Sequence, residues 1–303
     1  MEMRKPAYLS YSSFSLFEKD PETFYKRYIT PTKQPRDKQN FYMAIGSAFD
    51  AFVKADLYKI FINDGNPEYE KQTLFETQVE PQVRDLAWKD GHTLYDMYKK
   101  SGAYDDLMKD MKGCINPQFE STLEGQIEGG VVLLGKPDIK YINSSGARVI
   151  HDWKCSGFYS KTRPSPRQGY ISKYPGKTMH PKCAPFRHRG ALINSNCPMN
   201  LYCKDWAEQL TMYAWVLGEP IGGDYILTID QLIVDNVYRY SALCDGVWQR
   251  DLYNRIKRCW DACQTGHIFL NLPYEQNLAK AEAIDAELSV VDKNVEYMLR
   301  RER

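Results

Sequence analysis

Two segments with strand-like sequences lie on either side of a short turn near the middle of the chain. GGVVLLGKPDIKYI and ARVIHDWKC are rich in β-branched and aromatic residues, and they flank the turn sequence NSSG. The pattern predicts a β-hairpin centred on Ser145. Because positions 138 and 152 are equally far from Ser145, Asp138 and Asp152 should face each other, with Cβ atoms about 5 Å apart.

Side chains along this hairpin alternate between an apolar face and a charged face. The odd-numbered positions suit a protein core and are Val131, Leu133, Ile139, Tyr141, Val149 and Trp153. The even-numbered positions near the turn carry charge and are Lys136, Asp138, Lys140, Arg148, Asp152 and Lys154. Since alternate residues of a strand share a face, Lys154 lies beside Asp152, whereas His151 points to the opposite face and is not a candidate base.

The facing aspartates are the first candidate for a chemical site. Two opposed carboxylates repel each other, and a divalent cation between them removes the repulsion. Mg²⁺ prefers carboxylate oxygens and keeps several waters, and a nearby lysine can hold a nucleophilic water or offset charge on a phosphate. The alternative is an ordinary surface hairpin with an Asp–Lys pair, and a β-bulge would shift the register by one residue.

Positive charge is concentrated in one stretch, although the formal net charge of the chain is only +1. Between Cys155 and Lys204 there is no Asp or Glu, and nine Lys and Arg residues there leave −8 on the rest of the chain. Such asymmetry favours a polyanionic partner, and we expect a basic insertion at about 156–204 to contact DNA. The cations expected at the DNA are Lys161, Arg163, Arg167, Lys173, Lys177, Arg187 and Arg189. A solvated loop or a surface for a protein partner is the alternative.

The remaining sequence favours helices on both sides of the hairpin. Ser12 or Ser13 is expected to cap a first helix, and Asp20 a second helix that begins at Pro21. Asp205 and Glu208 form a capping-box pattern for a later helix, which Gly218 and Pro220 end. Hydrophobic spacing predicts helices at 43–61, 73–112, 205–218 and 246–266, a strand at 224–235, and helical sequence from about Tyr274 to the end.

Targeting and redox signals point to a cytoplasmic protein without a membrane partner. No run approaches the roughly 20 apolar residues that span a bilayer, and the first residues lack the apolar core of a signal peptide. Eight cysteines in such a chain are more often thiols or metal ligands than disulfides. A structural Zn²⁺ site could use four of five residues whose spacing matches no standard zinc finger, and scattered thiols are the alternative. These five are His180, Cys183, His188, Cys197 and Cys203.

The hairpin and three further motifs resemble one family of nucleases. Pro137-Asp138 followed by Asp152-Trp153-Lys154 is similar to the PD-(D/E)xK nuclease signature. Gln209 and Tyr213, at i and i+4 of a predicted helix, resemble the QxxxY motif of the RecB-like exonuclease clade. LSYSSFSLFEKDPETFYKRY and GSAFD resemble that clade's N-terminal helix and its Gly-x-x-x-His position. The resemblance covers about residues 8 to 270 in order.

This resemblance implies a fold. It implies an α/β (α+β) protein with a restriction-endonuclease-like core, in which a central mixed β-sheet is flanked by helices. The nuclease domain would cover residues 1–274, including the basic insertion, and a helical C-terminal arm would cover residues 275–303.

The resemblance also implies roles for individual residues. Asp138 and Asp152 would bind Mg²⁺ or Mn²⁺, with the Trp153 backbone carbonyl as a third ligand. Lys154 would position the attacking water. Gln209 and Tyr213 would orient Lys154 and the DNA backbone. Asp50 stands at the position of the clade's histidine and is either a further metal ligand or a helix-surface aspartate.

The implied function is a metal-dependent DNA exonuclease or end-processing nuclease of prokaryotic or viral type, working with a recombination or replication protein. A structure-specific endonuclease and a catalytically inactive nucleic-acid-binding or assembly protein are the alternatives, and RNA stays open as a substrate. Several relatives hold an iron–sulfur cluster with four cysteines. Here Asp20-Pro21 takes the place of the early cysteine and no cysteine follows Cys263, so we expect no iron–sulfur cluster.

Overall fold

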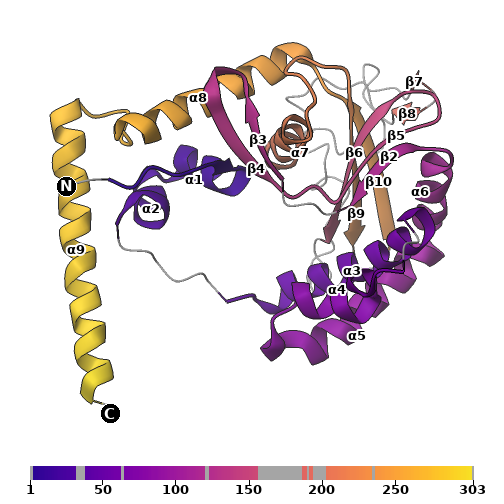
Figure 1. The fold of residues 1–303 in the computed structure, drawn as a ribbon, viewed down its shortest axis with the longest axis horizontal. Coiled ribbons are helices and arrows are strands. Elements are labelled where there is room, and N and C mark those ends of the chain that lie inside the picture. Colours follow the sequence, from indigo (N-terminus) through magenta and orange to yellow (C-terminus); the bar gives the residue numbers. More distant parts are fainter. Residues whose placement is uncertain are drawn as a thin grey trace. The chain divides into compact units, whose positions relative to one another are not determined.

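The chain divides into two compact units (Figure 1). Unit 1 contains Met1–Asp37, Glu124–Gly135 and Arg250–Arg303, and unit 2 contains Lys38–Leu123 and Lys136–Gln249. A computed structural model describes residues 3–31, 38–62, 65–119, 123–155, 186–189, 191–193, 203–233 and 236–301. The boundaries of these two units differ from the domain boundary expected at residue 274, and that boundary stays a prediction.

Unit 2 is built around a five-stranded mixed sheet with the strand order β10-β9-β6-β5-β2. β6 and β9 are parallel, and the other neighbouring strands pair antiparallel. A parallel pair needs a crossover connection, which here contains α7 (Lys204–Val216). The strands are β2 (Ile115–Phe119), β5 (Ile139–Ile142), β6 (Arg148–Cys155), β9 (Ile226–Ile233) and β10 (Asn236–Leu243).

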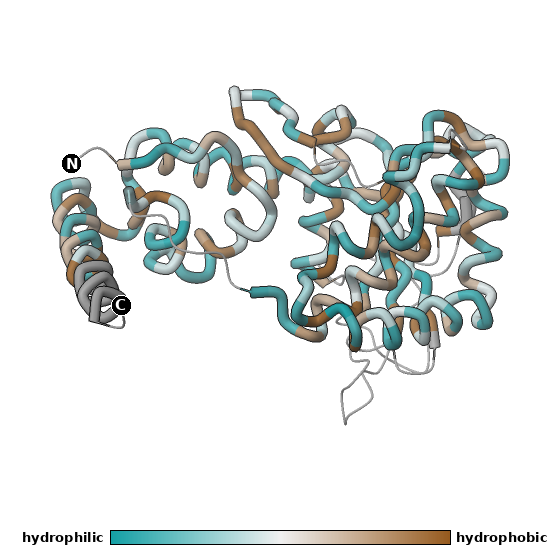
Figure 2. The backbone as a smooth tube through the Cα atoms, turned by 60° about the horizontal axis from the view of Figure 1, so that its bottom comes forward, coloured by the Kyte–Doolittle hydropathy of each residue, from teal (hydrophilic) through white to brown (hydrophobic). Residues whose placement is uncertain are grey.

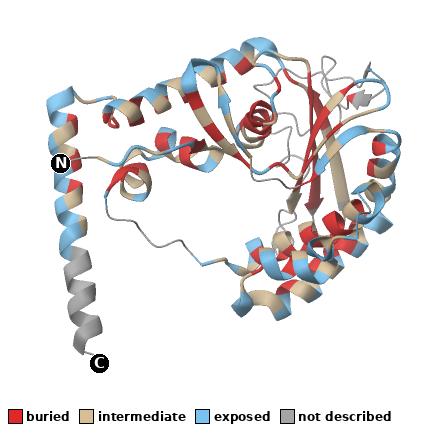
Figure 3. Cartoon of the chain, in the orientation of Figure 1, coloured by how far each residue is buried: buried red, intermediate tan, exposed pale blue. Residues whose placement is uncertain are grey.

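Helices cover both faces of this sheet. On one face, the Phe49 ring of α3 (Phe41–Leu57) lies 5.9 Å from the Trp153 ring of β6. On the other face, Lys140 Nζ donates a hydrogen bond of 2.7 Å to the Leu217 carbonyl at the end of α7. Figure 3 shows the buried residues of unit 2 gathered in β6 and β9 and on these helices. The protein therefore has the mixed α/β fold, with a mixed sheet flanked by helices, that the resemblance implied.

The helical region expected at 73–112 is interrupted twice. It consists of α4 (Lys71–Gln78), α5 (Arg84–Lys100) and α6 (Ala103–Met111). Pro81 begins a short 3₁₀ turn before α5, and Gly102 adopts a φ of 82° before α6. Proline and a left-handed glycine both end a regular helix, which explains the two breaks. The helix expected at 43–61 is α3 followed by a π-helical turn at Tyr58–Ile62.

The β5–β6 hairpin has the register that the sequence predicted. Ile139 pairs with His151 and Ile142 pairs with Arg148, so the two strands are symmetric about Ser145. The Asn143 side-chain oxygen accepts hydrogen bonds from two backbone N–H groups and stabilises the turn. The odd-numbered side chains of the hairpin are buried in the core of unit 2, as expected; they are Ile139, Tyr141, Val149 and Trp153.

The segment expected to be one strand before this turn is two strands in two different sheets. β4 (Val131–Gly135) belongs to a three-stranded sheet of unit 1, whereas β5 begins at Ile139. Gly135 and Pro137 lie at the break. Proline has no N–H to continue a ladder of hydrogen bonds and glycine weakens a strand, so the interruption has a local cause.

The first two helices are capped by side chains. α1 (Tyr11–Lys19) is capped by Ser10, whose hydroxyl accepts a hydrogen bond from the Ser13 backbone, so the expected cap at Ser12 or Ser13 is wrong by two or three residues. The Ser13 side chain in turn bonds the Ser10 backbone, completing a capping box that fixes the start at Ser10. Asp20 caps α2 (Pro21–Phe24) as predicted.

The start of α7 also differs from the prediction. The helix begins at Lys204 after Cys203, without a side-chain cap, so Asp205 and Glu208 do not form a capping box. Glu208 lies on the buried side of the helix, where its carboxylate is 3.8 Å from Lys204 Nζ. The predicted end of this helix near Gly218 is confirmed, because the helix ends directly before Leu217 and Gly218 adopts a φ of 86°.

Unit 1 joins segments from both ends of the chain. Its sheet has the order β1-β4-β3, with β1 (Leu9–Ser10) parallel to β4 and β3 at Leu123–Ile127. Asp285 of α9 (Tyr274–Arg301) accepts hydrogen bonds from Tyr25 and Thr30. In the coloured part of α9 in Figure 2, hydrophobic and hydrophilic residues are interspersed, and the buried residues Asn277, Ala281 and Ile284 recur at three- and four-residue steps, as in a helix that packs on one side. Across the described ranges, including α8 (Gly246–Thr265), no helix is long and apolar enough to span a membrane.

Candidate active site

Asp138, Asp152 and Lys154 come together at one end of the hairpin. Asp152 and Lys154 lie on β6, and Asp138 directly precedes β5, so the register places it opposite Asp152. The two carboxyl groups are close enough for a hydrogen bond, and Lys154 Nζ lies 2.5 Å from Asp152 Oδ2. The Trp153 backbone N–H donates a hydrogen bond of 2.9 Å to Asp138 Oδ2. This bond fixes the Asp138 side chain where the strand begins.

A chain of hydrogen bonds joins Lys154 to α7. Lys154 Nζ donates to Gln209 Oε1 at 2.7 Å, and Gln209 Nε2 donates to the Tyr213 hydroxyl at 2.7 Å. The i, i+4 spacing puts Gln209 and Tyr213 on one face of the helix. Burial, with the nearby charges of Asp152 and Asp138, raises the pKa of Tyr213 well above its usual range, so its hydroxyl stays protonated. α7 thus sets the direction of the Lys154 side chain.

Asp50 on α3 reaches the same group through Lys54, a residue that the sequence analysis did not identify. Lys54 is only 1% exposed. Its Nζ lies 2.6 Å from Asp50 Oδ2 and 3.4 Å from Asp138 Oδ1. Burial lowers the pKa of Lys54, but the two carboxylates outweigh burial and hold it above its ordinary value, so the ammonium is charged. The i, i+4 spacing of Asp50 and Lys54 on a predicted helix is the signal that could have found it.

Burial and like charge raise the pKa of two of the three carboxyl groups at this site. Burial raises the pKa of Asp152 to about 7, with Lys154 opposing and Asp138 adding to the effect. Burial likewise raises the pKa of Asp50 to about 6, against the attraction of Lys54. Burial acts in the same direction on Asp138, but Lys54, the Trp153 N–H and Lys154 hold its pKa below the usual range. Three carboxyl groups facing two lysines favour an additional cation.

The residues at the site fit a hard divalent cation. Asp50 Oδ1 is buried and has no hydrogen-bond partner among the residues that the structure describes, and Asp152 Oδ2 is buried with the Lys154 ammonium 2.5 Å away. Buried carboxylate oxygens are ligands that Mg²⁺ or Mn²⁺ prefers. The N–H and C=O of one strand residue face the same neighbour, so the Trp153 carbonyl points toward the edge where Asp138 lies.

The described residues do not bring a complete set of ligands together. Nowhere in these ranges are three His, Cys, Asp or Glu side chains close enough to hold a metal ion by themselves. Asp138 and Asp152 meet directly, whereas Lys54 stands between Asp50 and Asp138. The ligand role expected for Asp50 therefore stays a prediction.

Most of the residues expected to bind zinc or DNA lie outside the described residues. His188 and Arg187 belong to β7 (Phe186–His188), which pairs with β8 (Ala191–Ile193). Arg189 is exposed, with its guanidinium 3.5 Å from Asp224, and Cys203 is a free thiol next to α7. The others are His180, Cys183, Cys197, Lys161, Arg163, Arg167, Lys173 and Lys177, and both roles stay predictions.

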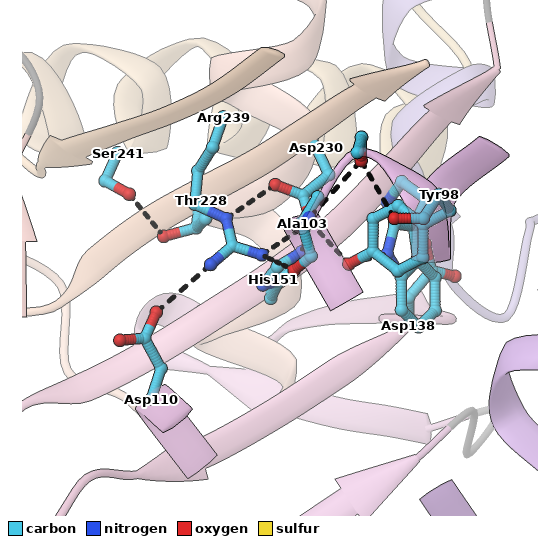
Figure 4. Close-up of polar contacts among 11 residues, drawn as sticks. Tyr98, Ala103, Asp110, Asp138, His151, Thr228, Asp230, Arg239 and Ser241 are labelled. Carbon is cyan, nitrogen blue, oxygen red and sulfur yellow. Dashed lines mark hydrogen bonds and ion pairs between the residues drawn. The ribbon is translucent and has the colours of Figure 1, made fainter. Parts of the chain in front are cut away.

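The opposite face of the sheet holds a buried charge network that the sequence analysis missed (Figure 4). Asp230 of β9 accepts hydrogen bonds from Arg239 at 2.7 and 2.8 Å and from the Tyr98 hydroxyl at 2.6 Å. His151 Nε2 lies 3.1 Å from the same carboxylate. Burial would raise the pKa of Asp230, but His151 and Arg239 hold it well below its usual range. An aspartate within the apolar strand sequence ILTIDQLI is the signal that could have revealed it.

This network ends at Trp153, which lies between the site residues Asp152 and Lys154 on β6. Trp153 Nε1 donates a hydrogen bond of 3.2 Å to the Tyr98 hydroxyl. Trp153 thus contacts the network through its side chain and Asp138 through its backbone N–H. His151 faces away from Asp152, as the strand parity predicted, and its contact with Asp230 is structural.

Comparisons with known proteins do not assign a family. No protein-family model matches the chain, and no curated protein matches it. Among solved structures, the crystal structure of SSO0001 is similar, with 14% identity and a TM-score of 0.26 over 80% of this chain and 83% of that chain. A likeness at this level carries no argument about fold or function.

Proposed function

We propose that this protein is a metal-dependent nuclease that hydrolyses phosphodiester bonds of DNA, as an exonuclease or end-processing enzyme. One observation carries the proposal. The hairpin register brings Asp138, Asp152 and Lys154 together, and Gln209 holds Lys154 from the neighbouring helix. A hairpin with these residues, a parallel strand and an intervening helix support a restriction-endonuclease-like core of the PD-(D/E)xK type.

Mg²⁺ or Mn²⁺ would be held by Asp138 and Asp152. The Trp153 carbonyl and Asp50 would supply further oxygens. When bound, such an ion polarises a phosphate oxygen and lowers the pKa of a bound water. The raised pKa of Asp152 is consistent with a site that is completed by a cation, because a cation removes the repulsion between the two carboxylates.

Lys154 is suited to hold the attacking water. An ammonium group has three N–H donors, and Asp152 and Gln209 are its partners among the described residues. The third donor can bind a water or a phosphate oxygen. Gln209 must present its oxygen to Lys154, because its amide nitrogen is used on the Tyr213 hydroxyl. This fixed orientation supports a positioning role for Gln209 and Tyr213.

The other parts of the proposal follow from the sequence. The basic insertion would form a wall of the DNA channel, since both of its ends adjoin the site, at Lys154 and before the Gln209 helix. The enzyme would work in the cytoplasm of a prokaryotic cell or virus-infected host with a recombination or replication protein. A structure-specific endonuclease is the second candidate. The complete set of Asp138, Asp152 and Lys154 disfavours an inactive binding protein.

The experiment that tests the proposal uses purified protein with Mg²⁺ or Mn²⁺ on linear DNA labelled at the 5′ or 3′ end, with closed circular DNA alongside. An exonuclease releases label from linear DNA and leaves circles intact. Circles that are cut as fast as linear DNA support the endonuclease instead. If neither DNA is cut with either metal, the proposal is wrong.

A further inference from the structure

Lys54 occupies the space between two carboxylates of the site. Its ammonium is 2.6 Å from Asp50 Oδ2 and 3.4 Å from Asp138 Oδ1, and its side chain is 1% exposed. Asp50 and Lys54 are one helical turn apart on α3, so the same rigid element presents both. The ammonium is thus a fixed part of the folded site and does not belong to an exposed side chain on the surface.

A metal ion and this ammonium compete for the same two oxygens. Mg²⁺ binds carboxylate oxygens at about 2.0–2.1 Å, so an ion shared by Asp50 Oδ2 and Asp138 Oδ1 would have to take the place of Lys54 Nζ. In sites that use two metal ions, the ions lie about 3.5–4 Å apart and are joined by shared ligands. Lys54 stands where a second ion, next to one held by Asp138 and Asp152, would have to be.

Lys54 has no easy way to leave this position. Moving the ammonium away would leave a buried charge without its partner, which is strongly unfavourable. The segment of α3 around it is packed into the core of unit 2, where Phe49, Phe52 and Val53 are fully buried. The lysine therefore remains when a divalent ion binds on the Asp138–Asp152 side.

We propose that Lys54 is a built-in cation that takes the place of a second metal ion, so that this site binds a single divalent ion. The inference rests on the proposed nuclease function, and it states how many divalent ions the site of that function binds. Asp50 Oδ2 is then committed to Lys54, and Asp50 offers only Oδ1 to the bound ion. The fixed ammonium supplies one positive charge beside Asp138 in every state of the site.

The test counts Mn²⁺ ions bound per chain, from the free Mn²⁺ signal in electron paramagnetic resonance, on full-length protein freed of metal. We expect one tightly bound ion for the parent and two for Lys54→Met, which keeps the unbranched stem of the side chain and removes the ammonium. Lys99→Met is the matched control, because Lys99 forms an Asp–Lys pair of 2.9 Å with Asp56 elsewhere in unit 2. This control should bind one ion.

Two tightly bound ions on the parent, or a single ion with parental affinity on a folded Lys54→Met, would overturn the inference. Circular dichroism and thermal melting show whether the variants fold. If Lys54→Met does not fold, Lys54→Gln and the count on the parent decide the question.

Cleavage assays on the same samples separate the two proposals. If the parent binds one ion but cuts no nucleic acid, the proposed nuclease function is wrong and the single-ion inference stands. If the parent binds two ions and cuts DNA, the nuclease function stands and the single-ion inference is wrong. A parent that binds no Mn²⁺ overturns both.

Discussion

Replacing Asp152 by asparagine should change how the stability of the metal-free protein depends on pH. Asp152 is 4% exposed, and burial raises its pKa to about 7 although Lys154 opposes the shift. In the unfolded chain an aspartate ionises near pH 4, roughly. Between these two values the folded protein binds one more proton than the unfolded chain. Its free energy of unfolding therefore falls as the pH rises from about 4 to about 7.

The size of the effect follows from the separation of the two pKa values. Each unit corresponds to about 1.4 kcal/mol, which gives an upper limit of about 4 kcal/mol above pH 7. Between pH 5 and pH 8.5 the change is about 2–3 kcal/mol. Asparagine has nearly the same shape and no proton to lose. The pKa of Asp50 is raised to about 6 in the parent, and Asp50 titrates in both proteins, so its own titration is common to the two profiles.

The assay is denaturant unfolding of the parent and of Asp152→Asn in excess chelator at pH 5 and pH 8.5. Relative to the parent, the variant should gain about 2–3 kcal/mol on going from the lower to the higher pH. Asp106→Asn is the control, because Asp106 is 64% exposed and pairs with Lys109 on the surface. Parallel pH profiles for the parent and Asp152→Asn would refute the reasoning that burial and Asp138 penalise the ionised carboxylate.

Three further predictions concern parts of the fold and site that surround these carboxylates. Asp230→Ala leaves Arg239 buried without its main partner, and the free energy of unfolding should fall by about 3–5 kcal/mol; an unchanged denaturation midpoint contradicts this. Gln209→Ala removes the hydrogen-bond partner of Lys154 and should lower the cleavage rate by about 10–100-fold with an unchanged melting temperature. If this variant cuts DNA at the parental rate, Gln209 does not position Lys154. Neutralising three cations of the insertion should weaken DNA binding and reduce the slope of log affinity against log salt by about 0.7–0.9 per lost phosphate contact, and an unchanged slope rules out the channel wall. The three cations are Lys161, Arg163 and Arg167.

The sequence predicted the hairpin well because two local signals agreed there. The period of two along each strand fixed which side chains share a face, and the turn NSSG fixed the centre of symmetry at Ser145. Together they placed Asp138 opposite Asp152. Another local signal predicted the end of α7 at Gly218, since glycine is favoured where φ is positive.

Features that depend on distant parts of the chain could not be predicted in this way. Lys54 matters because the fold brings α3 next to Asp138, 84 residues further along the chain, and a lysine on an amphipathic helix is usually exposed. The partners of Asp230 come from three other elements, and only Asp230 itself carries a sequence signal. Pro137 is a local sign of the break between β4 and β5, yet one strand was predicted there, and nothing local indicates the change of sheet.

The most direct test of the central proposal is the rate of cleavage of end-labelled linear DNA in Mg²⁺ by the parent, Asp152→Asn and Lys154→Met. The geometry predicts that the parent cuts, that excess chelator stops it reversibly, and that each substitution lowers the rate by about 10²–10⁴-fold while the protein stays folded. Cleavage at the parental rate by either folded variant, or in excess chelator, would contradict the account.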